Sequence, residues 1–196
     1  MGFLAEHGTF RILTREIIDS SRLFSCGNPD LDEFFMKDSS NYAEKLLGKT
    51  YCYLLDDNPA IILCAFTVSN DSVRVDQLPN SRKKKINNAI PREKQMRRYP
   101  AVLIGRLGVN VDYASKGVGT ELMDFIKRWF VQPDSKTGCR YLAVDSYNVK
   151  SALGFYEKNG FRYLFSNEEQ EAKNSGLPMP MKTRYMYFDL LDVLER

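Results

Sequence analysis

The run Ala114-Ser115-Lys116-Gly117-Val118-Gly119 decides the fold, because it joins a predicted strand to a predicted helix. Residues 101–109 before it are mostly apolar and predict a long strand. After it, apolar residues recur at helical spacing: Val118, Leu122, Phe125, Ile126, Trp129 and Phe130. Glycine lets a backbone approach a ligand, and the N–H groups at a helix N-terminus carry partial positive charge. The run therefore predicts a pyrophosphate-binding loop, with a plain tight turn as the alternative. It fits neither a dinucleotide fingerprint nor a kinase P-loop.

The rest of the chain predicts a mixed α/β fold. Strands are expected at residues 9–13, 49–55, 60–69, 139–144, 161–165 and 183–190. Helices are expected at 81–90 and at 149–159, where Gly160 forms a left-handed cap. Another helix starts at Asn28-Pro29, with an apolar stripe along it: Leu31, Phe34, Phe35, Tyr42 and Leu46. A polar loop is expected between the last two strands. No repeat or linker divides the chain, so a single domain over residues 1–196 is predicted.

A second motif, Ala152-Leu153-Gly154-Phe155-Tyr156-Glu157-Lys158-Asn159-Gly160-Phe161, follows the loop. Together with the strand Leu103–Val109 and the Gly117-Val118-Gly119 loop, it resembles the GNAT acetyltransferases. That family's cofactor loop reads Gln/Arg-x-x-Gly-x-Gly/Ala, and a later helix carries Phe-Tyr before Gly-Phe. The resemblance is good from about 101 to 165 and looser over the N-terminal half. It implies a mixed, mostly antiparallel central sheet flanked by helices, and acetyl-CoA as cofactor.

The resemblance implies a cofactor site built mainly from backbone groups. Two residues of the strand would bind the amides of the pantetheine arm as an added strand does. The amides of the loop and of the first helical turn would hold the pyrophosphate. The implied cofactor-binding residues are Leu107, Val109, Lys116, Gly117, Val118, Gly119, Thr120 and Asn148.

Tyr156 is the catalytic residue that the resemblance implies. Its phenol is a weak acid that would donate a proton to the departing CoA thiolate. The alternative for Tyr156 is an aromatic ring that packs beside Phe155 on a core helix. Two residues depart from the family pattern. Ala114 replaces the usual Gln or Arg, so a side-chain phosphate contact is missing for which Lys116 would compensate, and Asn148 lies one residue farther from Tyr156 than usual.

No general base is singled out by the sequence. His7 is the only histidine, and it stands near the start of the chain. Asp71 and Asp145 lie near strand ends, where surface or capping roles are the alternative. A lysine amine, with a pKa near about 10.4, must first lose a proton, whereas an α-amine near about 8 is partly neutral. The lack of a base therefore favours an α-amine or another weakly basic amine as acceptor.

Composition excludes several other classes. The cysteines are widely spaced, form no C-x-x-C pair and are expected to be free thiols: Cys26, Cys52, Cys64 and Cys139. Without clustered Cys and His, a zinc site or a His-based triad is disfavoured. No apolar run of about 18 residues and no signal-peptide core occur, so we expect a cytoplasmic protein without a membrane segment.

Net charge is only +3, but basic residues gather in one segment. Between residues 79 and 98, Glu93 is the one acid among eight basic residues: Arg82, Lys83, Lys84, Lys85, Arg92, Lys94, Arg97 and Arg98. Such a segment attracts phosphate-rich partners, or is simply a solvated helix face. Tyr99 is the only aromatic residue beside it, so stacking on bases is not indicated.

The run Arg106-Leu107-Gly108-Val109, the loop and the Phe155-Tyr156 helix also resemble the GNAT toxins of bacterial toxin–antitoxin pairs. Those enzymes acetylate the α-amine of aminoacyl-tRNA and are inhibited by a ribbon-helix-helix antitoxin. Three hypotheses follow. The first is direct acetyl transfer to a primary amine in a ternary complex. The second makes aminoacyl-tRNA the acceptor and a protein antitoxin the partner. The third is a non-catalytic acyl-CoA-binding module. Dimers are common among similar proteins, so a homodimer is an expected assembly.

Overall fold

The computed structural model describes residues 2–76, 78–88, 90–91, 95–135 and 137–195. Within them, seven strands form a sheet in the order β1-β2-β3-β4-β5-β7-β6. The β4–β5 pair is parallel, whereas β1–β2, β2–β3, β5–β7 and β6–β7 are antiparallel. The predicted mixed, mostly antiparallel sheet is therefore confirmed. The strands are β1 (Gly8–Ile12), β2 (Lys49–Leu55), β3 (Asn58–Arg74), β4 (Arg98–Val109), β5 (Tyr141–Tyr147), β6 (Arg162–Tyr163) and β7 (Thr183–Asp189).

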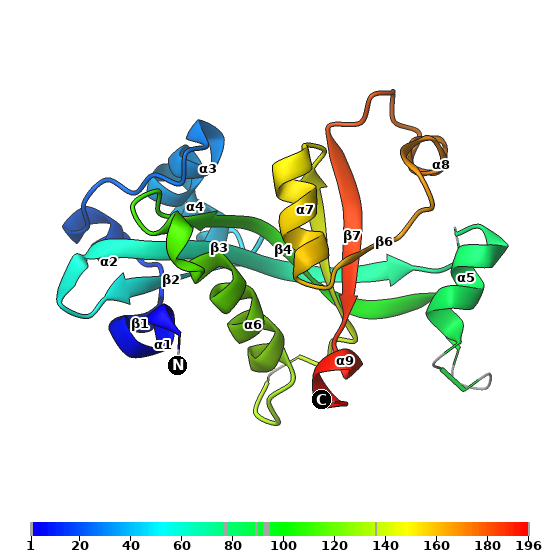
Figure 1. Cartoon of the computed structure of the whole chain (residues 1–196), viewed down its shortest axis with the longest axis horizontal. Coiled ribbons are helices and arrows are strands. Elements are labelled where there is room, and N and C mark those ends of the chain that lie inside the picture. Colours follow the sequence, from blue (N-terminus) through cyan, green and yellow to red (C-terminus); the bar gives the residue numbers. More distant parts are fainter. Residues whose placement is uncertain (1, 77, 89, 92–94, 136, 196) are drawn as a thin grey trace. The chain divides into compact units, whose positions relative to one another are not determined.

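Helices connect and flank these strands (Figure 1). They are α1 (Phe3–His7), α2 (Arg15–Ser20), α3 (Pro29–Glu33), the π-helical segment η1 (Phe34–Asp38), α4 (Ser39–Glu44), α5 (Asn80–Asn87), the 3-10 turn η3 (Ala114–Lys116), α6 (Val118–Phe130), α7 (Lys150–Lys158), α8 (Glu168–Ser175) and α9 (Leu191–Leu194). The chain forms two compact units. Unit 1 comprises residues 1–69 and 104–128, and unit 2 comprises residues 70–103 and 129–196. That residues 1–196 act as one domain stays a prediction.

In unit 1, the alternation of side chains along β2 explains why helices cover both faces of the strands. Cys52 belongs to a core shared with Phe34 and Phe35. Its neighbour Tyr53 points to the other face, where its ring meets Phe125 of α6 with centroids 5.4 Å apart. One face of β2 therefore holds the α3–α4 segment, and the other holds the apolar stripe of α6, which the sequence predicted.

In unit 2, a separate core lies between the sheet and α5. Ile86, the buried residue of α5, packs with Tyr99, Tyr141 and Tyr187 of three neighbouring strands. The rings of Tyr99 and Tyr141 meet edge to face with centroids 6.1 Å apart. Because α5 contributes only this one buried residue, the rest of its surface is polar.

Two predicted elements differ in the structure. The helix expected to run from Asn28 to Leu46 is broken into α3, η1 and α4, and Leu46 is 92% exposed with a left-handed φ of 56°. Leu46 is therefore not part of the apolar stripe, because it ends the helix. The predicted polar loop before β7 contains α8, which starts at an Asn167 cap and ends at Gly176 in the left-handed region. Within the described ranges, no helix is both long and apolar enough to cross a bilayer.

Candidate active site

The end of β4 is fixed in unit 1 by a buried asparagine that the sequence analysis did not single out. Asn110 Nδ2 donates to the carbonyl of Ile62 at 3.0 Å, and its backbone N–H donates to Leu63 at 2.9 Å. Its Oδ1 accepts from the N–H of Asp112 at 3.1 Å. Asn110 therefore stops the strand and starts the loop at a defined point. A lone Asn directly after an apolar strand was the available signal.

The loop before α6 leaves backbone N–H groups open where a phosphate site was predicted. Gly117 has φ +77°, and a Cβ built there would meet nothing within 4 Å. In the part of the chain that the structure describes, no protein acceptor is found for the N–H groups of Gly117, Val118 and Gly119. The amides of Lys116 and Thr120 donate instead to Tyr113 and Gly117, both at 3.1 Å. Three open N–H groups at the start of a 13-residue helix form an anion-binding geometry.

Lys116 stays beside this loop through aromatic contacts. Its Nζ lies 4.5 Å from the centroid of the Tyr113 ring and 5.2 Å from that of Phe3. The α1 segment that carries Phe3 is itself tied to α6, because Glu121 accepts from the N–H groups of Leu4 and Ala5 at 2.9 and 3.0 Å. Lys116 is exposed, so its charge is available near the loop.

Leu107 and Val109 lie beyond the part of β4 that pairs with β5. The parallel register of β4 with β5 ends at Leu103, which pairs with Ala143. At these two residues, which are predicted to bind a pantetheine arm, the backbone groups of β4 do not take part in the hydrogen-bond ladder with β5. Unit 1 therefore brings these two residues and the loop onto one continuous segment, residues 107–120.

Unit 2 carries Tyr156, on α7. Its ring packs against Phe155 and Phe161, with centroids 5.2 and 5.4 Å apart. Burial raises the pKa of Tyr156 to about 12. The left-handed Gly160, with φ +80°, ends the helix as predicted and turns the chain so that Phe161 reaches this ring. A half-buried phenol with a raised pKa stays protonated at neutral pH, which a proton donor requires.

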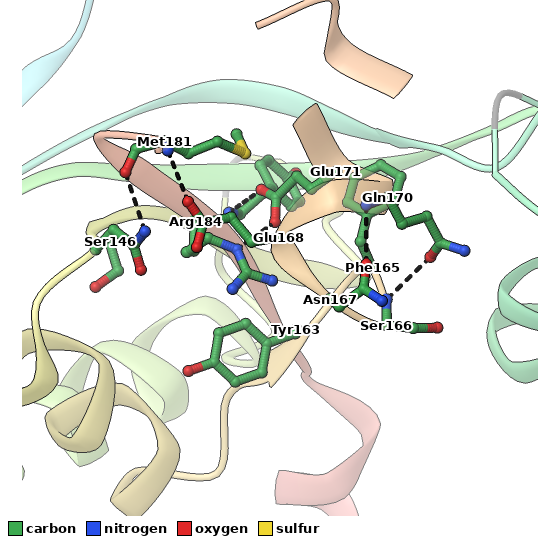
Figure 2. Close-up of polar contacts among 12 residues, drawn as sticks. Ser146, Tyr163, Phe165, Ser166, Asn167, Glu168, Gln170, Glu171, Met181 and Arg184 are labelled. Carbon is green, nitrogen blue, oxygen red and sulfur yellow. Dashed lines mark hydrogen bonds and ion pairs between the residues drawn. The ribbon is translucent and has the colours of Figure 1, made fainter. Parts of the chain in front are cut away.

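Asn148 is engaged within the protein. Its Nδ2 donates to the carbonyl of Met181 at 3.0 Å, and its backbone N–H donates to Lys182 at 2.9 Å. The N–H of Met181 in turn donates to Glu168 at 2.7 Å (Figure 2). The side chain thus holds the loop before β7 against the end of β5. Its role in cofactor binding stays a prediction.

Next to Met181, a buried ion pair joins α8 to β7 (Figure 2). Arg184 Nε and Glu171 Oε2 are 2.7 Å apart, and the two residues are 9% and 2% exposed. Glu171 Oε1 also accepts the backbone N–H of Tyr185 at 2.6 Å. The guanidinium lies over the ring of Tyr163, 4.9 Å from its centroid. Sequence reasoning missed this pair, because residues 166–182 were expected to form a polar loop.

We expect Glu171→Ala to lower the free energy of unfolding by about 3–5 kcal/mol, because it leaves the Arg184 charge buried without its partner. The matched control is Glu33→Ala, which removes a carboxylate from the exposed Lys37 pair, 3.1 Å apart, and should cost less than about 1 kcal/mol. Urea unfolding followed by circular dichroism measures both. Equal, small changes in the two variants would contradict the prediction.

The two aspartates considered as a base, Asp71 and Asp145, lie near one tyrosine and one glutamate in unit 2. Tyr185 donates its hydroxyl to Asp71 Oδ2 at 3.1 Å. Burial of its carboxyl group, and then the charges of Asp71 and Glu171, raise the pKa of Asp145. Burial and the Asp71 charge also raise the pKa of the Tyr185 phenol. Sequence reasoning found the aspartates but not Tyr185, since the topology alone brings β3 and β7 together.

The predicted basic segment is only partly available to a ligand. Arg82 is used inside the protein, where its Nη2 donates to the carbonyls of Tyr163 and Phe165 at 3.3 and 2.6 Å. Lys84 and Lys85 are exposed, and so are Arg97 and Arg98; Lys83 is half-buried. Arg92 and Lys94 lie outside the described residues. The free charge is therefore smaller than the sequence indicated.

The described residues contain no group of three or more His, Cys, Asp or Glu that could hold a metal ion. His7 lies on α1, where its ring meets Phe3 with centroids 5.0 Å apart. The cysteines are free, two of them buried (Cys52 and Cys64) and two partly exposed (Cys26 and Cys139).

Comparison with known proteins bears on both the fold and the family. Three solved structures that are similar to this chain are those of a Tyr-to-Phe mutant of KacT, of AtaT complexed with acetyl-methionyl-tRNAfMet, and of a Tyr-to-Phe mutant of the AtaT toxin bound to the C-terminus of the antitoxin AtaR and acetyl-CoA. Their TM-scores are 0.70, 0.66 and 0.61.

Sequence identity to these three is 18%, 18% and 16%. The alignments cover 96%, 96% and 95% of this chain and 98%, 98% and 96% of the other chains. This likeness shows a shared fold over almost the whole length. Residues 82–163 also match the family model described as an acetyltransferase (GNAT) domain. The predicted resemblance is confirmed: this chain has the fold of these structures, and its residues 82–163 match a GNAT acetyltransferase domain.

Proposed function

We propose that this protein transfers the acetyl group of acetyl-CoA to a primary amine by direct attack in a ternary complex. The observation that carries the proposal is the set of open N–H groups of Gly117, Val118 and Gly119 at the start of α6, directly after β4. Such a set suits the pyrophosphate of a CoA thioester, because it offers several donors and a helix dipole to one anion.

The chain's own residues then have distinct roles. The backbone of Leu107 and Val109 would hold the pantetheine amides, and Lys116 would add charge near the phosphates in place of a side chain at Ala114. Thr120 closes the first turn of α6 through Gly117 and would shape the loop. Tyr156 would protonate the CoA thiolate as it leaves, while the neutral amine attacks the thioester carbonyl. Asn148 would act on the cofactor through the loop that it holds.

We propose aminoacyl-tRNA as the acceptor class, with its α-amine as the attacking group. The AtaT structure with acetyl-methionyl-tRNAfMet supports this choice. The AtaT structure with the C-terminus of the antitoxin AtaR supports a second proposal, that an antitoxin protein binds this enzyme and inhibits it. An α-amine has a pKa near about 8 and is therefore already partly neutral at neutral pH, so it needs no strong base. Such a substrate and partner place the proposed activity in the cytoplasm.

The test is acetyl transfer from labelled acetyl-CoA to charged tRNA, compared with uncharged tRNA and with free lysine. We expect label in charged tRNA only, released as N-acetyl-amino acid when the ester is hydrolysed. Expression of the protein alone should also arrest growth. Transfer to small amines but not to charged tRNA would overturn the acceptor. Acetyl-CoA binding without transfer to any amine would favour a non-catalytic acyl-CoA-binding module.

A further inference from the structure

Arg106 stands on β4 immediately before the proposed pantetheine residues, but its side chain points to the other face of the strand. Side chains alternate along a strand, so Arg106 and Gly108 share a face and Leu107 does not. That face is identified by Gly108, where an added Cβ would lie 3.0 Å from Cys26 and 3.1 Å from Phe35. Arg106 therefore faces the α3–α4 segment of unit 1.

The guanidinium of Arg106 rests on aromatic rings. Its Cζ lies 3.8 Å from the centroid of Phe34 and 5.5 Å from that of Tyr42. The two rings meet each other edge to face, with centroids 5.5 Å apart. Phe34 is buried and opens the π-helical segment η1, a type of helix distortion that is frequent at functional sites. The rings fix the plane of the guanidinium.

Within the described part of the chain, no anion neutralises this group. Among the described residues, no carboxylate forms an ion pair with Arg106 and no oxygen accepts a hydrogen bond from it. By contrast, Arg140 and Arg184 are each paired with a carboxylate at 2.7 Å. Arg106 is only partly exposed, so water reaches a limited part of its five N–H donors. A stacked guanidinium with free N–H edges is preorganised for a planar or bidentate anion.

We propose that Arg106, held on Phe34 and Tyr42, binds a phosphate of the acceptor's 3′-terminal nucleotide. This inference rests on the proposed function, which supplies an acceptor whose amine is esterified to a nucleotide. Arginine forms paired hydrogen bonds with phosphate, and nucleotides are commonly bound by arginine next to aromatic rings. Arg106 would then set specificity for amines attached to a nucleotide over free amines. The other source of phosphate is the cofactor, whose proposed residues Leu107 and Val109 lie on the same strand.

Binding of two aminoacyl-nucleoside analogues tests the proposal without turnover. Puromycin carries the α-amine and the nucleoside but no phosphate, and puromycin 5′-phosphate adds that group. Calorimetric titration of the wild-type protein, saturated with CoA, should give at least about tenfold tighter binding of the phosphorylated analogue, as charge-assisted hydrogen bonds imply. Arg106→Leu should remove that preference, and Arg106→Lys should keep part of it. Arg22→Gln, which removes an exposed charge of unit 1, should leave it unchanged.

The outcomes separate this inference from the proposed function. An unchanged preference in folded Arg106→Leu would show that the residue only packs β4 against α3 and α4, and would overturn the inference. If Arg106→Leu weakens acetyl-CoA binding and leaves the analogue preference unchanged, Arg106 binds a phosphate of the cofactor. That result would also overturn the inference. If Arg106→Leu does not fold, Arg106→Lys decides, because it keeps the charge but not the paired donors. A reduced preference in Arg106→Lys would then support the inference, and a full preference would overturn it. Failure of acetyl transfer to charged tRNA, with the binding preference intact, would instead reject the proposed reaction.

Discussion

Gly117→Glu should weaken acetyl-CoA binding by more than about 100-fold. Two effects act together. The added side chain must adopt a φ of +77°, which costs about 1–3 kcal/mol for a residue with a Cβ. Its carboxylate would also stand among the open N–H groups of Val118 and Gly119, where like-charge contact with a pyrophosphate costs several kcal/mol. Isothermal titration calorimetry with acetyl-CoA measures the change directly.

Gly138→Glu is the matched control for charge and size. Gly138 is exposed in unit 2, its added Cβ would also meet nothing within 4 Å, and its φ lies outside the left-handed region. This variant should bind acetyl-CoA as the wild type does. Gly117→Ala separates strain from charge, because it keeps the φ penalty and adds no carboxylate. If Gly117→Glu bound acetyl-CoA normally, the loop would be a plain tight turn, and the proposed cofactor site would be wrong.

Tyr156→Phe should lower kcat by about 100-fold or more, with acetyl-CoA affinity within about twofold of the wild type. General acid catalysis contributes about 10²–10⁴ in rate, and the ring that packs on Phe155 and Phe161 is retained. Tyr163→Phe is the control, because the ring under Arg184 is likewise kept and only a hydroxyl is lost. Steady-state kinetics on charged tRNA gives both constants. A fall in affinity with kcat unchanged would mean that the hydroxyl binds ligand and donates no proton in the slow step.

The pH profile gives a second reading of Tyr156. Since burial raises its pKa to about 12, the phenol stays protonated through the range in which the enzyme can be assayed. The rate should therefore rise with pH as an acceptor α-amine loses its proton near about 8, and should then stay level. A loss of rate between about pH 8 and 10 that disappears in Tyr156→Phe would show that the phenol ionises there.

Sequence alone predicted those parts of the fold whose signals are local. The caps at Asn28 and Gly160, the strands and the stripe of α6 each depend on residues within a few positions, and each is confirmed. The α8 helix was missed because it buries only Glu171 and Ala172, so it shows no apolar stripe. Leu46 was misassigned because its apolar side chain fits helical spacing, although its backbone leaves the helix there.

The candidate site divides in the same way. The loop at Gly117 and the helix of Tyr156 were visible because glycines and an aromatic pair stand at fixed offsets from one another. Arg106 gave no such signal. Its proposed role in phosphate binding depends on Phe34 and Tyr42, more than 60 positions away, and on the lack of any carboxylate partner among the described residues. Arg82 shows the reverse error, because a charge that looked free in sequence donates to two backbone carbonyls.

The alternation of β4 also has an evolutionary consequence. On this strand, the proposed binding of acetyl-CoA uses main-chain groups of Leu107 and Val109, which most side-chain substitutions leave intact. The opposite face, at Arg106, acts only through its side chain. Substitution of that single side chain would therefore change the acceptor specificity of a lineage while its binding of acetyl-CoA stays the same. Divergence within such enzymes would then begin with codon changes at one position of a shared strand, without rebuilding the pocket of the donor.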